Sequence, residues 1–103
     1  MLIGLLLILA LPVAAQRKVK FGIFDKATEQ PIIGAVITYA DNEELKSPQR
    51  VVTNMDGEAT ISVPQSDKCY YQVSSMGYKP LKGTIGRDSS LKLFMTGDVM
   101  KVN

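Results

Sequence analysis

The chain has 103 residues, with 12 Lys and Arg against 10 Asp and Glu, and a formal net charge of +2. This length allows one small domain, and so small a charge without a Lys/Arg run argues against nucleic acid as a partner. The absence of His and the single Cys exclude the commonest general base, the commonest zinc ligand and any disulfide framework.

Targeting is the predicted role of the first segment. Residues 2–11 form the apolar run LIGLLLILAL, followed by Pro12 and the small residues of VAA at positions 13–15. Such residues suit cleavage after Ala15, and the run is shorter than the ~20 residues of a membrane-spanning helix. We therefore expect a signal peptide over 1–15 and an exported chain from residue 16. No Lys or Arg precedes the run, so either the true start lies upstream or the n-region is weak. An uncleaved membrane anchor is the alternative to a signal peptide.

Short strands are predicted for the rest of the chain. Apolar and polar residues alternate with a period of two in segments about ten residues apart, which is typical of a β-sandwich. Polar loops with Gly or Pro separate the segments, and no helical period appears after the apolar run. The sequence therefore predicts an all-β, seven-stranded sandwich with strands near 19–23, 35–39, 50–53, 59–63, 71–75, 81–85 and 90–95.

Two local features carry predictions of their own. The segment NMDG (residues 54–57) separates the third and fourth expected strands and predicts a hairpin, with Gly57 free to adopt a positive φ. Cys69 adjoins two tyrosines on an expected strand, which predicts a buried, unreactive thiol. An intermolecular disulfide is the alternative for an exported chain with one Cys.

Three motifs follow one another along these strands. They are IIGAVI (residues 32–37) after a loop with Asp25 and Pro31, TNMDGEATI (53–61) and VSSMGY (73–78). In this order and spacing they resemble the carboxypeptidase-regulatory-like domain, a transthyretin-like (immunoglobulin-like) β-sandwich, over most of residues 19–95. Two positions depart from the family pattern, because Asn54 stands where Asp is usual and Ala59 where a core Phe is usual.

Structural roles are expected for most motif residues. A glycine permits a positive φ or a close approach of the backbone, and Asp-Gly favours a tight turn. Tyr78 is also a candidate ligand contact, because a tyrosine offers contact area at low entropic cost. Tyr39 is the second candidate contact, and Tyr70 and Tyr71 are further companions. The residues of the structural motif are Gly34, Asp56, Gly57, Gly77 and Tyr78.

The resemblance also implies a cellular setting. Such domains occur as N-terminal periplasmic extensions of TonB-dependent outer-membrane transporters of Bacteroidota, and as accessory domains on peptidases and surface proteins. Residues 94–102 are similar to the segment that leads the transporter domains into the plug, the alternative being a spare terminal strand. We thus expect a signal peptide (1–15), a sandwich domain (16–96) and a C-terminal tail (97–103).

The expected function is protein contact in the cell envelope. We expect a monomeric, non-catalytic domain, periplasmic or associated with the outer membrane, whose partner is a transporter or its energising apparatus. The alternatives are a carbohydrate- or surface-binding accessory module, with a glycan as partner, and an inert remnant of a transporter gene. A free-standing domain and a fragment of a longer protein are both compatible with these residues.

No catalytic residue, cofactor or metal site is predicted. The sequence has no GxSxG elbow and no His-based metal pair, and its acids fall in loops, so we expect no enzyme. Two alternatives stay open. One is an intramolecular isopeptide bond from Lys18 or Lys20 to Asn103 beside Glu58. The other is a Ca²⁺ site at one end of the sandwich, formed by Asp25, Asp41, Asn42, Glu43, Glu44 and Asp56.

Overall fold

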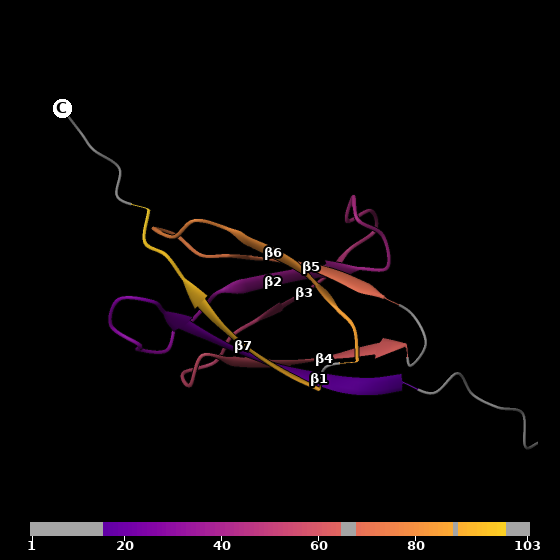
Figure 1. Cartoon of the computed structure of the whole chain (residues 1–103), viewed down its shortest axis with the longest axis horizontal. Helices are drawn as coiled ribbons and strands as arrows, with labels where there is room; N and C mark the ends of the chain where they lie inside the picture. Colours follow the sequence, from indigo (N-terminus) through magenta and orange to yellow (C-terminus); the bar gives the residue numbers. More distant parts are fainter. Residues whose placement is uncertain (1–15, 65–67, 88, 99–103) are drawn as a thin grey trace, which may run out of the picture.

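The computed structural model describes residues 16–64, 68–87 and 89–98. They form seven strands in two stacked sheets and contain no helix (Figure 1). The predicted all-β architecture of seven strands is therefore confirmed. Nowhere in these ranges is there a helix long and apolar enough to cross a bilayer. The predicted signal peptide lies outside the described residues.

The smaller sheet has β1 at its centre. β1 (Gln16–Asp25) pairs antiparallel with β4 (Glu58–Pro64) and parallel with β7 (Ser90–Met95). Val19, Phe21 and Ile23 alternate with polar or small residues along β1, and these three side chains are fully buried. The period of two in the sequence thus becomes one inward and one outward face of this sheet.

The larger sheet contains the other four strands. Its order is β3 (Gln49–Val52), β2 (Val36–Ala40), β5 (Cys69–Ser74) and β6 (Leu81–Ile85), with every neighbouring pair antiparallel. β3 forms one edge of this sheet and β6 the other. Because β3 leads directly into β4, the chain crosses from one sheet to the other between residues 52 and 58.

The core lies between the two sheets. Phe21 of β1 contacts Tyr71 of β5 edge-on, with ring centroids 5.2 Å apart and an interplanar angle of 78°. Ala59, which stands where the resembled family has a Phe, is the cross-strand partner of Phe21. The Phe21 ring therefore supplies an aromatic side chain next to that position. Fully buried aliphatic and sulfur-containing side chains complete the core: Val19, Ile23, Ile37, Val63, Val73, Ile85 and Met95.

The predicted hairpin between the third and fourth strands is wrong. β3 pairs with β2 and β4 pairs with β1, so the two strands belong to different sheets. The turn itself forms, because Gly57 N–H donates to the Asn54 carbonyl and Asn54 N–H to the Glu58 carbonyl, both at 2.9 Å. Thr53, where the chain starts to cross between the sheets, is attached to the segment before β2, because its hydroxyl is hydrogen-bonded to the backbone of Ala35 and Ile32.

The predicted boundary between sandwich and tail falls within a paired segment. Gly97 forms a bridge with Tyr78, Lys79 N–H donates to the Thr96 carbonyl at 2.9 Å, and Asp98 N–H donates to the Gly77 carbonyl at 2.8 Å. Residues 96–98 are thus attached to the segment between β5 and β6. The remainder of the predicted tail, 99–103, lies outside the described residues.

Candidate functional site

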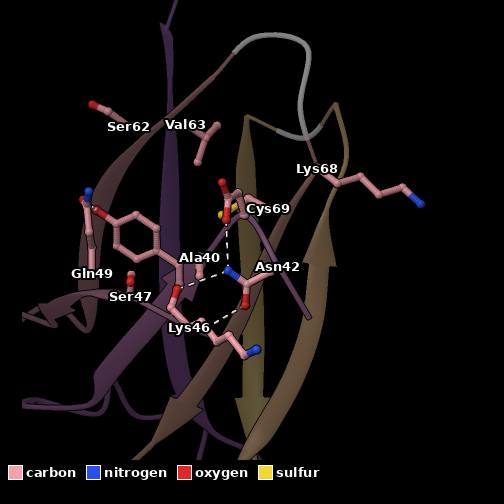
Figure 2. Close-up of a pocket in the computed structure, with 11 residues that line it drawn as sticks. Ala40, Asn42, Lys46, Ser47, Gln49, Ser62, Val63, Lys68 and Cys69 are labelled. Atoms are coloured by element: carbon pink, nitrogen blue, oxygen red, sulfur yellow. Dashed lines mark hydrogen bonds between the residues drawn. The ribbon is translucent and has the colours of Figure 1, made fainter. Parts of the chain in front are cut away.

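A pocket of about 480 Å³ opens at the end of the sandwich where β2 runs into the loop of residues 41–48 (Figure 2). Both sheets line it, since its walls come from β2, β3 and β5 on one side and from β4 on the other. Its volume lies within the range of small-molecule sites. Its lining includes Tyr39, Lys46, Ser47, Gln49, Val63 and Cys69.

One wall of the pocket is an anchored tyrosine. The Tyr39 hydroxyl donates to Gln49 Oε1 at 2.9 Å, which links β2 to the start of the edge strand β3. Burial, and secondarily the nearby Cys69, raises the pKa of Tyr39, so its hydroxyl stays protonated and remains a donor at neutral pH. Val63 of β4 and Ala40 of β2 add buried apolar surface.

The loop of residues 41–48 is held in place by Asn42. Its Oδ1 accepts the backbone N–H of Lys46 at 2.7 Å, while its Nδ2 donates to the Lys46 carbonyl at 3.1 Å and to Asp41 Oδ1 at 3.0 Å. These bonds lie beside two residues with positive φ, Leu45 at 57° and Ser47 at 49°. Asn42 therefore stabilises a backbone conformation that residues other than Gly rarely adopt.

Cys69 lies beside the pocket with a buried side chain, as predicted. The whole residue is 4 % exposed, and burial is the main cause that raises the pKa of its thiol. The thiol form is a poor nucleophile, so this environment is that of an unreactive Cys. Its low exposure also disfavours the alternative of an intermolecular disulfide.

The candidate ligand contacts do not form one surface. Tyr39 lines the pocket together with Val63, which pairs with Arg17, so it lies at the end of the sandwich where β1 starts. Tyr78 lies at the opposite end, where its hydroxyl donates to Asp25 Oδ2 at the end of β1 at 2.6 Å. The hypothesis of a shared platform is wrong for this reason. Tyr71 is the cross-strand partner of Tyr39 but is buried in the core, and Tyr70 lines a separate pocket with Leu45 and Lys82.

The contact between Tyr78 and Asp25 makes stability depend on pH. The Tyr78 hydroxyl, and next the Thr28 backbone amide, hold the pKa of Asp25 below its ordinary value, while the bond to Asp25 raises the pKa of Tyr78. Because the pKa of Asp25 is lower in the folded than in the unfolded chain, its carboxylate stabilises the fold at pH values above the unfolded pKa of about 4. This stabilisation is lost as the pH falls through the folded pKa. Because the pKa of Tyr78 is higher in the folded chain, its protonated hydroxyl stabilises the fold below the unfolded pKa of about 10. This stabilisation is lost as the pH rises through the folded pKa.

Tyr78→Phe is accordingly expected to lower the melting temperature most near neutral pH. The difference from the unaltered chain shrinks towards zero as the pH falls through the lowered pKa of Asp25, because Asp25 is then protonated in both. Thermal melts between pH 2 and 8 measure it, with Tyr70→Phe as the matched control. A difference that stays constant over this range would show that the bond does not depend on the charge of Asp25.

The glycines of the structural motif have left-handed backbones. Gly34, Gly57 and Gly77 have φ of 79°, 74° and 87°. Asn54 rather than Asp56 organises the turn before β4, since Asn54 Oδ1 accepts the N–H of Asp56 at 2.9 Å and that of Glu58 at 3.0 Å. An amide oxygen thus takes the acceptor position where the resembled family has a carboxylate.

The acidic residues of the Ca²⁺ alternative do not gather at one end of the sandwich. Asp25 and Asp56 lie in or beside loops at the end that holds Tyr78, whereas residues 41–44 lie at the pocket end (Figure 1). Among the described residues, no three His, Cys, Asp or Glu side chains lie close enough to share a metal ion. Of the residues named for the isopeptide alternative, Lys20 and Glu58 form an exposed ion pair at 3.1 Å. Asn103 lies outside the described residues.

The residues lining the pocket include Tyr39, predicted as a ligand contact, Cys69, predicted as a buried thiol, and Asp41 and Asn42 of the Ca²⁺ alternative. Tyr39 was a candidate contact, but Gln49, Lys46 and Ser47 were not. Gln49 carried no signal, because its role depends on the pairing of β3 with β2. Asn42 offered one, since an Asn in a polar loop is a typical turn former.

Comparisons with known proteins show the fold and no family. No family model matches the chain, and no curated protein matches it. Hydroxyquinol 1,2-dioxygenase from Pseudomonas putida DLL-E4 is similar in structure, with a TM-score of 0.62 at 12 % identity over 86 % of this chain and 59 % of that one. Catechol 1,2-dioxygenase from Pseudomonas arvilla C-1 has a TM-score of 0.63 at 11 % identity, over 85 % and 54 %. S.CueP has a TM-score of 0.61 at 14 % identity, over 82 % and 66 %.

These matches correct the functional expectation from sequence. The chain was expected to be a non-catalytic module associated with a TonB-dependent transporter, and not an enzyme. Its fold is instead shared with dioxygenases, two further ones at 17 % and 18 % identity included. The missing motifs and the placement of the acids in loops therefore do not exclude catalysis, and that exclusion was wrong. The chain spans a little over half the length of the first two dioxygenases.

Proposed function

We propose that the pocket at the end of the sandwich binds a small hydroxylated aromatic ring of the catechol class. The observation that carries this proposal is the pocket itself, which combines a tyrosine ring and apolar surface with mixed hydrogen-bonding groups. Aromatic rings pair favourably with one another, and a ring hydroxyl both donates and accepts. Gln49, Ser47 and Lys46 offer partners of both kinds.

The names of two structural neighbours support the choice of ligand. Catechol and hydroxyquinol are the rings in the names of these dioxygenases. We assign binding and no reaction to this pocket, because a shared fold alone carries no chemistry. The polarity of the pocket, rather than the fold, makes a hydroxylated ring a better ligand than a purely apolar one.

Calorimetric titration with catechol tests the proposal. At about 0.5 kcal/mol per non-hydrogen atom, a ligand of this size binds with a Kd near 1 mM. Tyr39→Leu removes the ring and the donor to Gln49 and is expected to weaken binding at least tenfold, since an aromatic contact and a hydrogen bond are lost together. Cyclohexane-1,2-diol, which has hydroxyls without the aromatic ring, is expected to bind more weakly than catechol.

A matched control separates the pocket from general effects. Tyr70→Leu makes the same change at a tyrosine that does not line this pocket, and catechol affinity is expected to stay unchanged. Equal losses in the two variants, or an unchanged Kd in Tyr39→Leu, would refute the pocket as the binding site.

We also infer that the chain is an exported member of the carboxypeptidase-regulatory-like family. The three motifs support this, because Gly34, Gly57 and Gly77 all have the backbone conformation that a glycine permits. The apolar run of residues 2–11 supports export. The predicted envelope partner and the monomeric state stay predictions.

Intact-mass analysis of the chain recovered from expressing cells tests export. Cleavage after Ala15 gives a chain that begins at Gln16, with a mass lower by that of residues 1–15. Recovery of only the full-length mass from the membrane fraction would instead favour the uncleaved anchor.

A further inference from the structure

The outer surface of the three-stranded sheet differs from the rest of the molecule. The outward positions of β1 carry Lys18, Lys20 and Phe24, and those of β7 carry Lys92 and Phe94, because inward residues alternate with them along both strands. The parallel register places Phe24 beside Phe94. These five residues are called the lysine–phenylalanine face below.

Its two aromatic rings lie together at the surface. Phe24 and Phe94 have ring centroids 5.9 Å apart, and Phe94 is 39 % exposed. The Phe24 ring lies close to Gly22, since a Cβ built there would meet its Cε2 at 3.0 Å. Lys92 Nζ lies over both rings, 5.2 Å from the Phe24 centroid and 5.7 Å from that of Phe94. The lysine–phenylalanine face therefore presents a cation and two apolar rings side by side.

The face is positively charged. Among the described residues at outward positions of β1, β4 and β7, Glu58 is the only acid, and it is paired with Lys20 at 3.1 Å. Lys18 and Lys92 have no carboxylate partner within the described ranges. An exposed ion pair of this kind contributes little to stability, so Lys20 is also available to another anion.

We propose that the lysine–phenylalanine face binds the surface of an anionic lipid bilayer. Exposed rings beside lysines suit such an interface, because the rings enter the boundary of the acyl chains while the lysines reach the headgroups. Nucleic acid fits less well, since stacking on a base needs an open ring face and Lys92 lies over both rings. The lipid site is separate from the pocket and does not depend on its ligand.

Co-sedimentation with vesicles tests this proposal. Vesicles of phosphatidylcholine with 40 % phosphatidylglycerol are compared with pure phosphatidylcholine, using the chain in the form that cells release. We expect binding to the anionic vesicles that weakens as salt rises from about 0.05 to 0.5 M. Lys18→Gln with Lys92→Gln is expected to weaken it by about 25-fold, at roughly fivefold per lysine.

A second variant separates lipid from other polyanions. Phe94→Ser keeps every charge, so it is expected to weaken binding to anionic vesicles while leaving any binding to heparin unchanged. The matched control is Lys82→Gln with Val52→Ser, which changes exposed residues of the four-stranded sheet. All variants carry the same N-terminus, so residues 2–11, if retained, contribute equally to each.

Three outcomes would overturn the proposal. The first is equal binding to both kinds of vesicle. The second is a control variant that loses as much affinity as the variants of the face. The third is a Phe94→Ser chain that binds anionic vesicles as tightly as the unaltered chain, which would mean attraction by charge alone. Circular dichroism of each variant establishes that the sandwich is intact.

Discussion

Replacing Gly57 by Ala is expected to destabilise the domain by about 3–5 kcal/mol. Gly57 has φ of 74°, and a Cβ there would lie 2.6 Å from the Ile23 carbonyl oxygen and 2.9 Å from Pro31 Cβ. Ile23 cannot give way easily, because it lies in the central strand of its sheet and its N–H donates to the Gly57 carbonyl at 2.7 Å. Urea unfolding measures the change in the free energy of unfolding.

Two other glycines separate the causes of this loss. Gly34 has a similar φ of 79°, but no atom lies within 4 Å of a Cβ added there. Gly34→Ala should therefore lower the free energy of unfolding only by the backbone strain, about 1–2 kcal/mol. Gly86→Ala has neither feature and should be nearly neutral. Equal losses at Gly34 and Gly57 would contradict the close contact with β1.

Thr53→Val is expected to lower the free energy of unfolding by about 2–4 kcal/mol. Thr53 is 4 % exposed, and its hydroxyl accepts the Ala35 N–H at 2.9 Å and donates to the Ile32 carbonyl at 2.6 Å. Valine keeps the shape and removes both bonds, which leaves a buried amide and a carbonyl without this partner. Urea unfolding checks this value too.

Thr53→Ser is the control for the hydroxyl. It keeps both hydrogen bonds and loses one methyl group, so its cost should stay near 1 kcal/mol. A serine variant as damaging as valine would show that the methyl group contributes as much as the two bonds. Because valine keeps that methyl group, a valine variant as stable as the unaltered chain would contradict a role of the two bonds in holding the crossing between β3 and β4.

Strand positions were predictable because they depend on local alternation. Val19, Phe21 and Ile23 alternate in the sequence and are all buried in the structure. Pairing was not predictable in the same way. Residues 50–53 and 59–63 look like a hairpin locally, but bonds from Thr53 to residues 32 and 35 keep β3 with β2. Those partners are distant in sequence and leave no periodic signal.

The candidate site was less predictable than the fold. Tyr39 and Tyr78 are equal candidates by residue type, and only the register separates them, since Tyr78 meets Asp25 while Tyr39 meets Gln49. The exclusion of enzymes failed for another reason. It relied on the absence of known catalytic motifs and on the functions implied by one resembled family, whereas one sandwich fold serves many functions.

The parallel pairing of β1 with β7 has a consequence for how the chain folds. β1 is the first of the described strands to be synthesised, yet its Lys20 pairs with Ser90, about 70 residues later. The smaller sheet cannot be completed until the last of the described strands has left the ribosome. Contacts this distant in sequence must overcome loop closure first, and such sandwiches fold in milliseconds to seconds. A chain of this topology therefore stays partly unpaired during its synthesis, because β1 lacks one of its two neighbouring strands until residues 90–95 are made.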